Sequence, residues 1–278
     1  MKNVIKNLVI LSAIIFAFAS CNSDDSSNNT GTVKVQLTDA VFPFNFVTEA
    51  NVAVAKVELK TENGEFTTVF EASENGSATY NMVTLTNGTT AQVESTSLEN
   101  GTYTEARVTL SDANIHLSNN TNYNANIDAN TQTTVTINPP LVVEIGQDSN
   151  ILFDLDLQNS FSFLGNGNLP WMNWINSITD ITGCSFTPHF RVCDLDQTGA
   201  IGGAVSVSGA NIENADVSIQ VDGATVHTHL EADGSFKFIG VRNGTYAVSV
   251  ETENNGSTTE NNIVVSNNAT TTCSLVIN

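Results

Sequence analysis

The twenty residues 232–251, ADGSFKFIGVRNGTYAVSVE, decide the fold of the C-terminal part of the chain. Apolar side chains alternate with polar ones in the runs FKF (236–238) and YAVSV (246–250), which is the two-residue period of a β-strand with one buried face. The pair Asn243-Gly244 lies between the runs and suits a tight turn, because such turns need residues that tolerate positive φ. The stretch therefore predicts two antiparallel strands joined by a hairpin.

The same alternation recurs along most of the chain, while the period of an amphipathic helix is almost absent. Asn-Gly and Asp-Gly pairs separate the alternating runs, as in the turns of β-hairpins. Many short strands divided by such turns are typical of sandwiches and barrels. We therefore predict an all-β protein with two antiparallel β-sandwich domains in tandem, and strands near residues 32–38, 51–59, 102–110, 133–137 and 151–157.

Three motifs define the C-terminal domain, predicted to cover residues 198–278. GGAVSVSG (202–209) and NADVSIQVDG (214–223) precede the stretch at 232–251 in that order. This series resembles the carboxypeptidase regulatory-like domain, which implies a seven-stranded prealbumin-like sandwich. In that family the domain is an accessory module without an active site of its own.

The preceding domain, predicted to cover residues 32–197, carries a second resemblance. GTVKVQLTDA (31–40), LENGTYTEARVTL (98–110) and ILFDLDLQNSF (151–161) occur in the order found in the bacterial family domain of unknown function (DUF) 4382. The resemblance implies an exported β domain and supplies no activity or catalytic residue. Residues 165–185 look like an insertion relative to that pattern.

The N-terminus has the pattern of an export signal. Two lysines precede the apolar run Leu8–Ala19, which is too short to cross a bilayer and has the length of a signal-peptide core. Ala19 and Ser20 followed by Cys21 resemble the lipobox of bacterial lipoproteins, in which the cysteine is acylated and becomes the new N-terminus. We predict a lipoprotein signal peptide at 1–21 and lipidation of Cys21; the alternative is an ordinary signal peptide that ends near a free cysteine.

Residues 22–31 predict a flexible tether, because they contain no large apolar side chain. Asp24 and Asp25 resemble a surface-export signal of one group of diderm bacteria, and the alternative is that they only keep the tether soluble. We therefore predict a protein anchored by lipid in the outer membrane and facing the cell exterior.

Composition restricts the partners. The chain has 29 acidic and 9 basic residues and a formal net charge of −20. Such a chain is repelled by phosphate backbones and anionic headgroups, so we predict no nucleic-acid partner and membrane contact through the lipid alone.

The insertion contains both tryptophans. Trp171, Trp174, Ile175 and Ile178 have the spacing of one helix face, which predicts a short amphipathic helix beginning near Pro170. Trp171 and Trp174 then form either an aromatic platform for a sugar ring or part of a stripe that packs against the sandwich.

Three cysteines remain after Cys21. Cys184 and Cys193 lie nine residues apart, and an exported protein experiences conditions that permit a disulfide between them. Cys273 alternates with apolar residues on its strand and is predicted to be a small core residue.

Titratable pairs offer weaker candidate sites. Asp154 and Asp156 share one strand face and either catalyse hydrolysis, bind Ca²⁺ together with Asp39, or lie on a solvated surface. His227 and His229 form a candidate metal pair without a third ligand nearby. We predict no cofactor.

The sequence thus predicts a non-catalytic surface lipoprotein that presents β domains for adhesion or for binding glycan or protein. It contains no Ser-His-Asp spacing, zinc-protease motif or phosphate-binding glycine loop. Two alternatives stay open. One is an accessory subunit of an outer-membrane uptake or secretion complex, and the other is a polysaccharide hydrolase that uses paired carboxylates.

Overall fold

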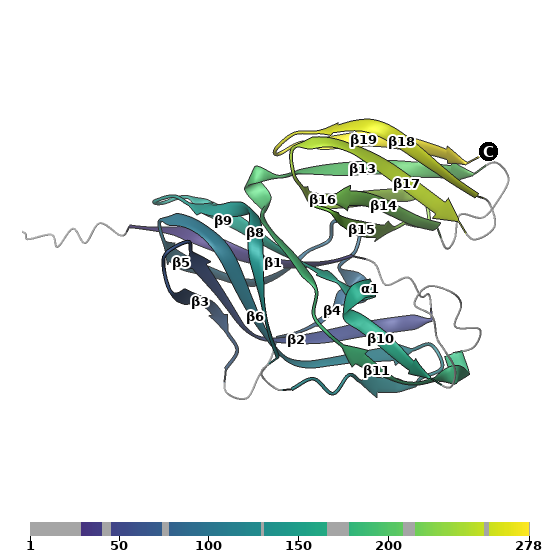
Figure 1. Cartoon of the computed structure of the whole chain (residues 1–278), viewed down its shortest axis with the longest axis horizontal. Helices are drawn as coiled ribbons and strands as arrows, with labels where there is room; N and C mark the ends of the chain where they lie inside the picture. The colour runs from purple at the N-terminus through teal and green to yellow at the C-terminus, as the bar shows by residue number, and fades with distance from the viewer. Residues whose placement is uncertain are drawn as a thin grey trace, which may run out of the picture.

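The computed structural model describes residues 29–40, 46–73, 78–128, 131–165, 178–207, 215–252 and 256–277. Two β domains follow one another along the chain, as Figure 1 shows, the first in purple to green and the second in green to yellow. Within the described ranges no helix has the length and apolar character needed to span a bilayer. The prediction of an all-β protein with two domains is confirmed.

The first domain contains the first twelve strands and four short helical turns. The strands are β1 (Thr30–Ala40), β2 (Val47–Thr61), β3 (Phe66–Glu71), β4 (Ala78–Asn81), β5 (Ala91–Glu99), β6 (Gly101–Leu117), β7 (Asn122–Asn124), β8 (Thr131–Val143), β9 (Asp148–Asp156), β10 (Phe161–Gly165), β11 (Ile181–Phe186) and β12 (Phe190–Asp194). The turns are η1 (Met82–Thr84), α1 (Leu157–Ser160), η2 (Ile178–Asp180) and η3 (Leu195–Gln197). The main sheet has the order β3-β2-β6-β8-β12-β9-β1-β5, and β10 pairs with β11 in a separate hairpin.

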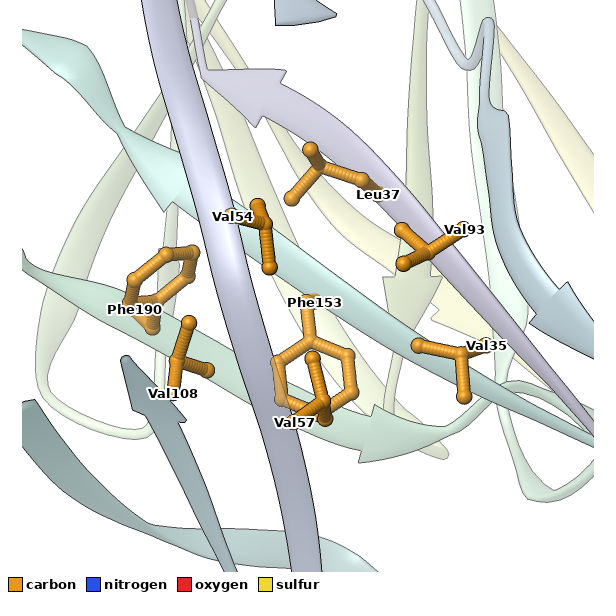
Figure 2. Close-up of a pocket in the computed structure, with 8 residues that line it drawn as sticks. All are labelled: Val35, Leu37, Val54, Val57, Val93, Val108, Phe153 and Phe190. Atoms are coloured by element: carbon orange, nitrogen blue, oxygen red, sulfur yellow. The ribbon is translucent and has the colours of Figure 1, made fainter. Parts of the chain in front are cut away.

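Alternation along the strands builds the first core. Leu37 of β1, Phe153 of β9 and Val57 of β2 belong to one buried cluster, so the two halves of the sheet face each other across the interior. A small apolar hollow remains between them (Figure 2), lined by Val35, Leu37, Val54, Val57, Val93, Val108, Phe153 and Phe190. An apolar space of this kind stays empty of water because it offers no hydrogen-bond partner.

The second domain consists of seven described strands, as the resemblance implied. They are β13 (Gly199–Val207), β14 (Ala215–Val221), β15 (Ala224–His229), β16 (Ser235–Val241), β17 (Gly244–Thr252), β18 (Gly256–Val265) and β19 (Thr270–Ile277). The sheets β16-β13-β19 and β15-β14-β17-β18 enclose a core of their own. Phe236 and Phe238 both point into it, with ring centroids 5.9 Å apart, as the opening stretch of sequence predicted.

The sheets differ from the purely antiparallel arrangement that we predicted. β1 pairs in parallel with β9, β8 with β12, and β13 with β19. Short turns can join only antiparallel neighbours, and parallel neighbours need a long connection. Each of these pairs joins strands that are separated by other elements of the chain.

Candidate functional site at the domain junction

The predicted carboxylate pair lies where the two domains meet. Asp154 shares a face of β9 with Leu152, opposite the face that enters the first core. The second domain covers this face: a Cβ atom added to Gly240 would lie 2.9 Å from Leu152 Cδ2 and 3.0 Å from Cys193 Sγ. Gly240 also has φ +64°, so glycine suits this position on two grounds. Asp154 is only 6% exposed as a result.

Arg191 compensates the buried charge of Asp154. The two residues are directly opposite on β12 and β9, and Arg191 Nη2 and Nε lie 2.6 and 3.2 Å from Asp154 Oδ2. The same guanidinium donates hydrogen bonds to the backbone carbonyls of Ile239, at 3.1 Å, and Gly240 in the second domain. Burial opposes the charge of Arg191, but Asp154, together with Cys193 and Asp222, raises the pKa of Arg191. One partly buried cation therefore binds groups of both domains.

Asn87 forms a second link. Asn87 and Gly88 have φ values of 57° and 76°, so they form a tight turn of the kind their sequence predicts. Asn87 Oδ1 accepts hydrogen bonds from Lys237 N, at 2.9 Å, and from Thr228 Oγ1, at 3.1 Å. Asn87 Nδ2 donates to Glu231 Oε1 at 2.7 Å. A turn of the first domain thus forms hydrogen bonds with strands β15 and β16 of the second domain.

His227 contributes a titratable group near the same junction. Its Nδ1 atom lies 2.9 Å from both carboxylate oxygens of Asp216. Burial opposes protonation, but Asp216 and the charge of Asp156 in the first domain together raise the pKa of His227. His229 lies opposite Asp216 on the neighbouring strand. No cluster suited to a metal ion is found around His227 and His229 or anywhere else in the described part of the chain.

The other two predicted carboxylates, Asp39 and Asp156, have structural roles: one is buried and the other caps a helical turn. Asp39 is 7% exposed, and burial, with the charges of Asp154 and Asp156, raises its pKa well above 3.8 although the backbone N–H of Leu157 lowers it. Burial therefore favours the neutral, protonated form of Asp39. Asp156 Oδ1 caps α1 by accepting a hydrogen bond from Asn159 N at 2.9 Å. These three acids do not converge on one position for Ca²⁺.

The predicted disulfide is wrong for this structure, because the two sulfur atoms lie in different environments. Cys184 belongs to the first core, and its Sγ lies 3.5 Å from Tyr123 O. Cys193 lies on the outer face of β12, with its Sγ 3.9 Å from Gly240 O in the second domain. Both thiols are free. Cys273 is buried in the second core, as predicted.

The remaining predicted site residues lie outside the described residues. These are the lipidation residue Cys21, the acidic pair Asp24 and Asp25, and the tryptophans Trp171 and Trp174. The predicted amphipathic helix falls on the same undescribed stretch except for its end, where Ile178 begins η2 and packs against the first core.

Comparisons with known proteins give two family matches. Residues 30–169 match the domain of unknown function DUF4382, and residues 200–278 match the carboxypeptidase regulatory-like domain. Both families occur in the order that the sequence predicted. The comparison with curated proteins finds no match.

Similarity to solved structures is low. The Bacillus anthracis TIE protein is 9% identical over 88% of this chain and 40% of its own, with a TM-score of 0.25. A leucine-rich repeat protein from Bacteroides thetaiotaomicron is 14% identical over 90% and 26%, with a TM-score of 0.20. BcpA, the major pilin subunit of Bacillus cereus, is 12% identical over 90% and 70%, with a TM-score of 0.21. This chain thus spans less than half of the first two structures, and TM-scores at this level carry no inference about it.

Proposed function

The chain belongs to the DUF4382 family and continues into a carboxypeptidase regulatory-like domain, and from this premise we propose that it is a non-catalytic surface lipoprotein. Its two β domains act as one unit for adhesion or for binding a glycan or protein ligand. The observation that carries the proposal is the junction itself, where the best candidate carboxylate is buried in a contact that joins the domains.

The geometry of this carboxylate favours a structural role over hydrolysis. A glycosidase needs two carboxyl groups about 5 to 10 Å apart that flank a substrate bond. Asp154 instead faces Arg191 under the cover of Gly240, and Asp156 caps a helical turn. A sugar ring has no access to Asp154 while the domains stay in contact.

The anchor is the second part of the proposal. Acylated Cys21 would hold the chain at the membrane, and β1 begins at Thr30 after a short tether. Eight tether residues span at most about 28 Å when fully extended. The acidic surface is repelled by anionic headgroups, so the domains stand away from the membrane instead of lying on it.

Replacing Cys21→Ser tests the anchor. We expect loss of acylation and release of the protein into the soluble fraction, because the lipid supplies the lasting attachment. Ser26→Ala, in the same tether, is the matched control and should stay with the membrane. Retention of the Cys21→Ser protein on membranes after a carbonate wash would contradict the proposal.

Replacing Asp24→Ala and Asp25→Ala together tests the orientation. Lipidation should persist while protease access on intact cells falls, and Asn28→Ala with Asn29→Ala is the control. Unchanged access would show that the acidic pair only keeps the tether soluble. Recovery of a stoichiometric membrane partner after cross-linking on intact cells would instead favour the accessory-subunit alternative.

A further inference from the structure

A regular array of polar side chains covers the outer face of the strands β3, β2, β6 and β8. The strand registers align eleven polar side chains and Phe66 in three rows, and we call these twelve side chains the polar grid. The rows are Thr68, Glu58, Arg107 and Thr134; Phe66, Lys60, Glu105 and Thr136; and Glu71, Lys56, Thr109 and Gln132. The residues between these positions, such as Val57 and Ala106, point into the first core.

Ion pairs fix the middle of the grid. The side chain of Glu58 is 7% exposed and lies 2.7 Å from Arg107 Nε and 3.1 Å from Lys56 Nζ. The hydrogen bond from Arg107, above all, lowers the pKa of Glu58, so this carboxylate is charged at neutral pH. Lys60 Nζ lies 3.3 Å from Glu105 Oε1. Each of the three cations therefore already faces a carboxylate.

An aromatic ring restrains two of these cations further. The Arg107 guanidinium carbon lies 4.0 Å from the ring centroid of Phe66, and Lys60 Nζ lies 5.4 Å from it. Cation–π contacts at this range hold a charged group in place. Arg107 is thus held on one side by Glu58 and on the other by Phe66, which reduces the entropy it loses when a ligand binds.

We propose that the polar grid is a binding site for a neutral saccharide chain, which deepens and rests on the proposed function. Three basic and three acidic side chains balance within the grid, although the whole chain has a net charge of −20. A polyanion finds no excess positive charge here. A protein partner needs a largely apolar contact centre, and the grid offers Phe66 as its sole large apolar side chain.

A saccharide matches what the grid presents. Each sugar hydroxyl both donates and accepts hydrogen bonds, and ionised groups form the strongest of these bonds. Exposed Thr68, Thr134, Thr136 and Gln132 add uncharged partners along the margins. The hydroxyl of Thr109 is buried within the grid and has no hydrogen-bond partner among the described residues.

The spacing suits an extended chain of rings. Neighbouring strands lie about 5 Å apart, and side chains on one face repeat about every 7 Å along a strand. A saccharide lying along a row therefore meets a new polar group at each strand. A ligand bound in this way touches only the first domain and leaves the junction intact.

Binding of defined oligosaccharides to the full chain tests the inference. The probes are neutral gluco-, xylo- and manno-hexasaccharides, with oligomers of a uronic acid as the anionic comparison, measured by isothermal titration calorimetry. The double variant Thr134→Val with Thr136→Val removes two exposed hydroxyls and keeps good strand formers. Thr245→Val, at an exposed strand position of the second domain, is the matched control.

We expect at least one neutral probe to bind, with affinity about tenfold lower in the double variant, since two lost hydrogen bonds have about that effect. The control should bind like the parent chain. Arg107→Lys, which keeps the charge and loses the planar fork, should also weaken binding. Equal affinity of parent and double variant, binding of the uronic acid oligomers alone, or no binding to any neutral probe would each overturn the inference.

These outcomes separate the inference from the proposed function. A neutral glycan that binds the double variant as tightly as the parent chain would move the site off the grid and leave a glycan-binding surface protein. A chain that binds no neutral probe and still cross-links to one defined surface protein would keep the function and overturn the saccharide site. If the Cys21→Ser protein stays on the membrane, the lipoprotein proposal is contradicted, and the inference about the grid is unaffected.

Discussion

Arg191 lies opposite Asp154 in the first domain and donates to the carbonyl oxygen of Ile239 in the second. Its guanidinium is 2.6 Å from the carboxylate and 3.1 Å from that carbonyl. Removing one partner of a buried ion pair leaves an uncompensated charge, and this loss is larger than the net value of the pair. The junction therefore depends on both residues being present.

Replacing Arg191→Met should lower the free energy of unfolding by about 3 to 5 kcal/mol, because Asp154 then stays buried and unpaired. Urea denaturation measures the loss. Arg242→Ala breaks the more exposed pair with Asp222 and should cost no more than about 1 kcal/mol. The double variant Arg191→Met with Asp154→Leu should recover most of the stability, and equal losses for the Arg191 and Arg242 variants would contradict the burial argument.

Replacing Asn87→Ala should weaken the contact between the domains. The change leaves Lys237 N and Glu231 without their partner in the first domain and should cost about 1 to 3 kcal/mol. We expect faster proteolysis at the connection around 195–199. Asn63→Ala, in an exposed Asn-Gly turn, is the control. Identical digestion of both variants would show that Asn87 does not link the domains.

Replacing Asp39→Asn should change how stability depends on pH. Burial, as the largest cause, raises the folded-state pKa of Asp39 above 3.8. The parent chain therefore has the full contribution of this group below about pH 4 and loses it as pH rises through the raised pKa. The variant lacks that loss. Its free energy of unfolding relative to that of the parent chain, measured by urea denaturation, should therefore increase from about pH 4 toward neutral pH. Parallel stability profiles over about pH 4 to 8 would contradict this assignment.

The three described thiols should be free and unreactive in the folded protein. Burial raises the pKa of Cys184 and of Cys273 to about 11, and burial likewise raises that of Cys193 to about 11. Alkylation near pH 8 should therefore be slow until denaturant is added. Mass spectrometry of unreduced protein checks the pairing, and a peptide linked through Cys184 and Cys193 would contradict the structure.

The hollow in the first core predicts a stabilising substitution. Val57→Ile directs an added methylene toward a space bordered by Phe153 and Val108 (Figure 2) and should add about 0.5 to 2 kcal/mol. Val248→Ile, at a fully buried position of the second core, is the control and should cost about 1 to 3 kcal/mol by overpacking. Thermal denaturation distinguishes the two; destabilisation by both would show that the hollow cannot accept a methyl group.

Alternation of side chains predicts the strands well because burial of one face is a local property. The run at 151–157 correctly assigns Phe153 and Leu155 to the core. It also places Asp154 on the other face, but alternation does not reveal what covers that face. The second domain covers that face. Asp154, for which the sequence left open a solvated surface or a catalytic pair, is therefore buried beside Arg191.

Sequence spacing also failed to identify the contacts that need two domains. Cys184 and Cys193 lie nine positions apart, yet the two side chains belong to different layers of the structure. The Asn87-Gly88 pair correctly predicts a turn, and its contact with Lys237 depends on how the domains dock. One signal was present in the sequence: Arg191 is a lone cation within a strand, and a cation that is largely removed from solvent needs an acidic partner.

The position of β1 has a mechanical consequence. The strand follows the tether and lies between β9 and β5, paired with both along most of its length. Tension applied through the tether would pull along this strand, so its hydrogen bonds on both sides would bear the load together in shear. A load held on the outer face of the first domain would pass from that domain into β1 without crossing the contacts of Arg191 and Asn87. The second domain would then remain outside the line of force.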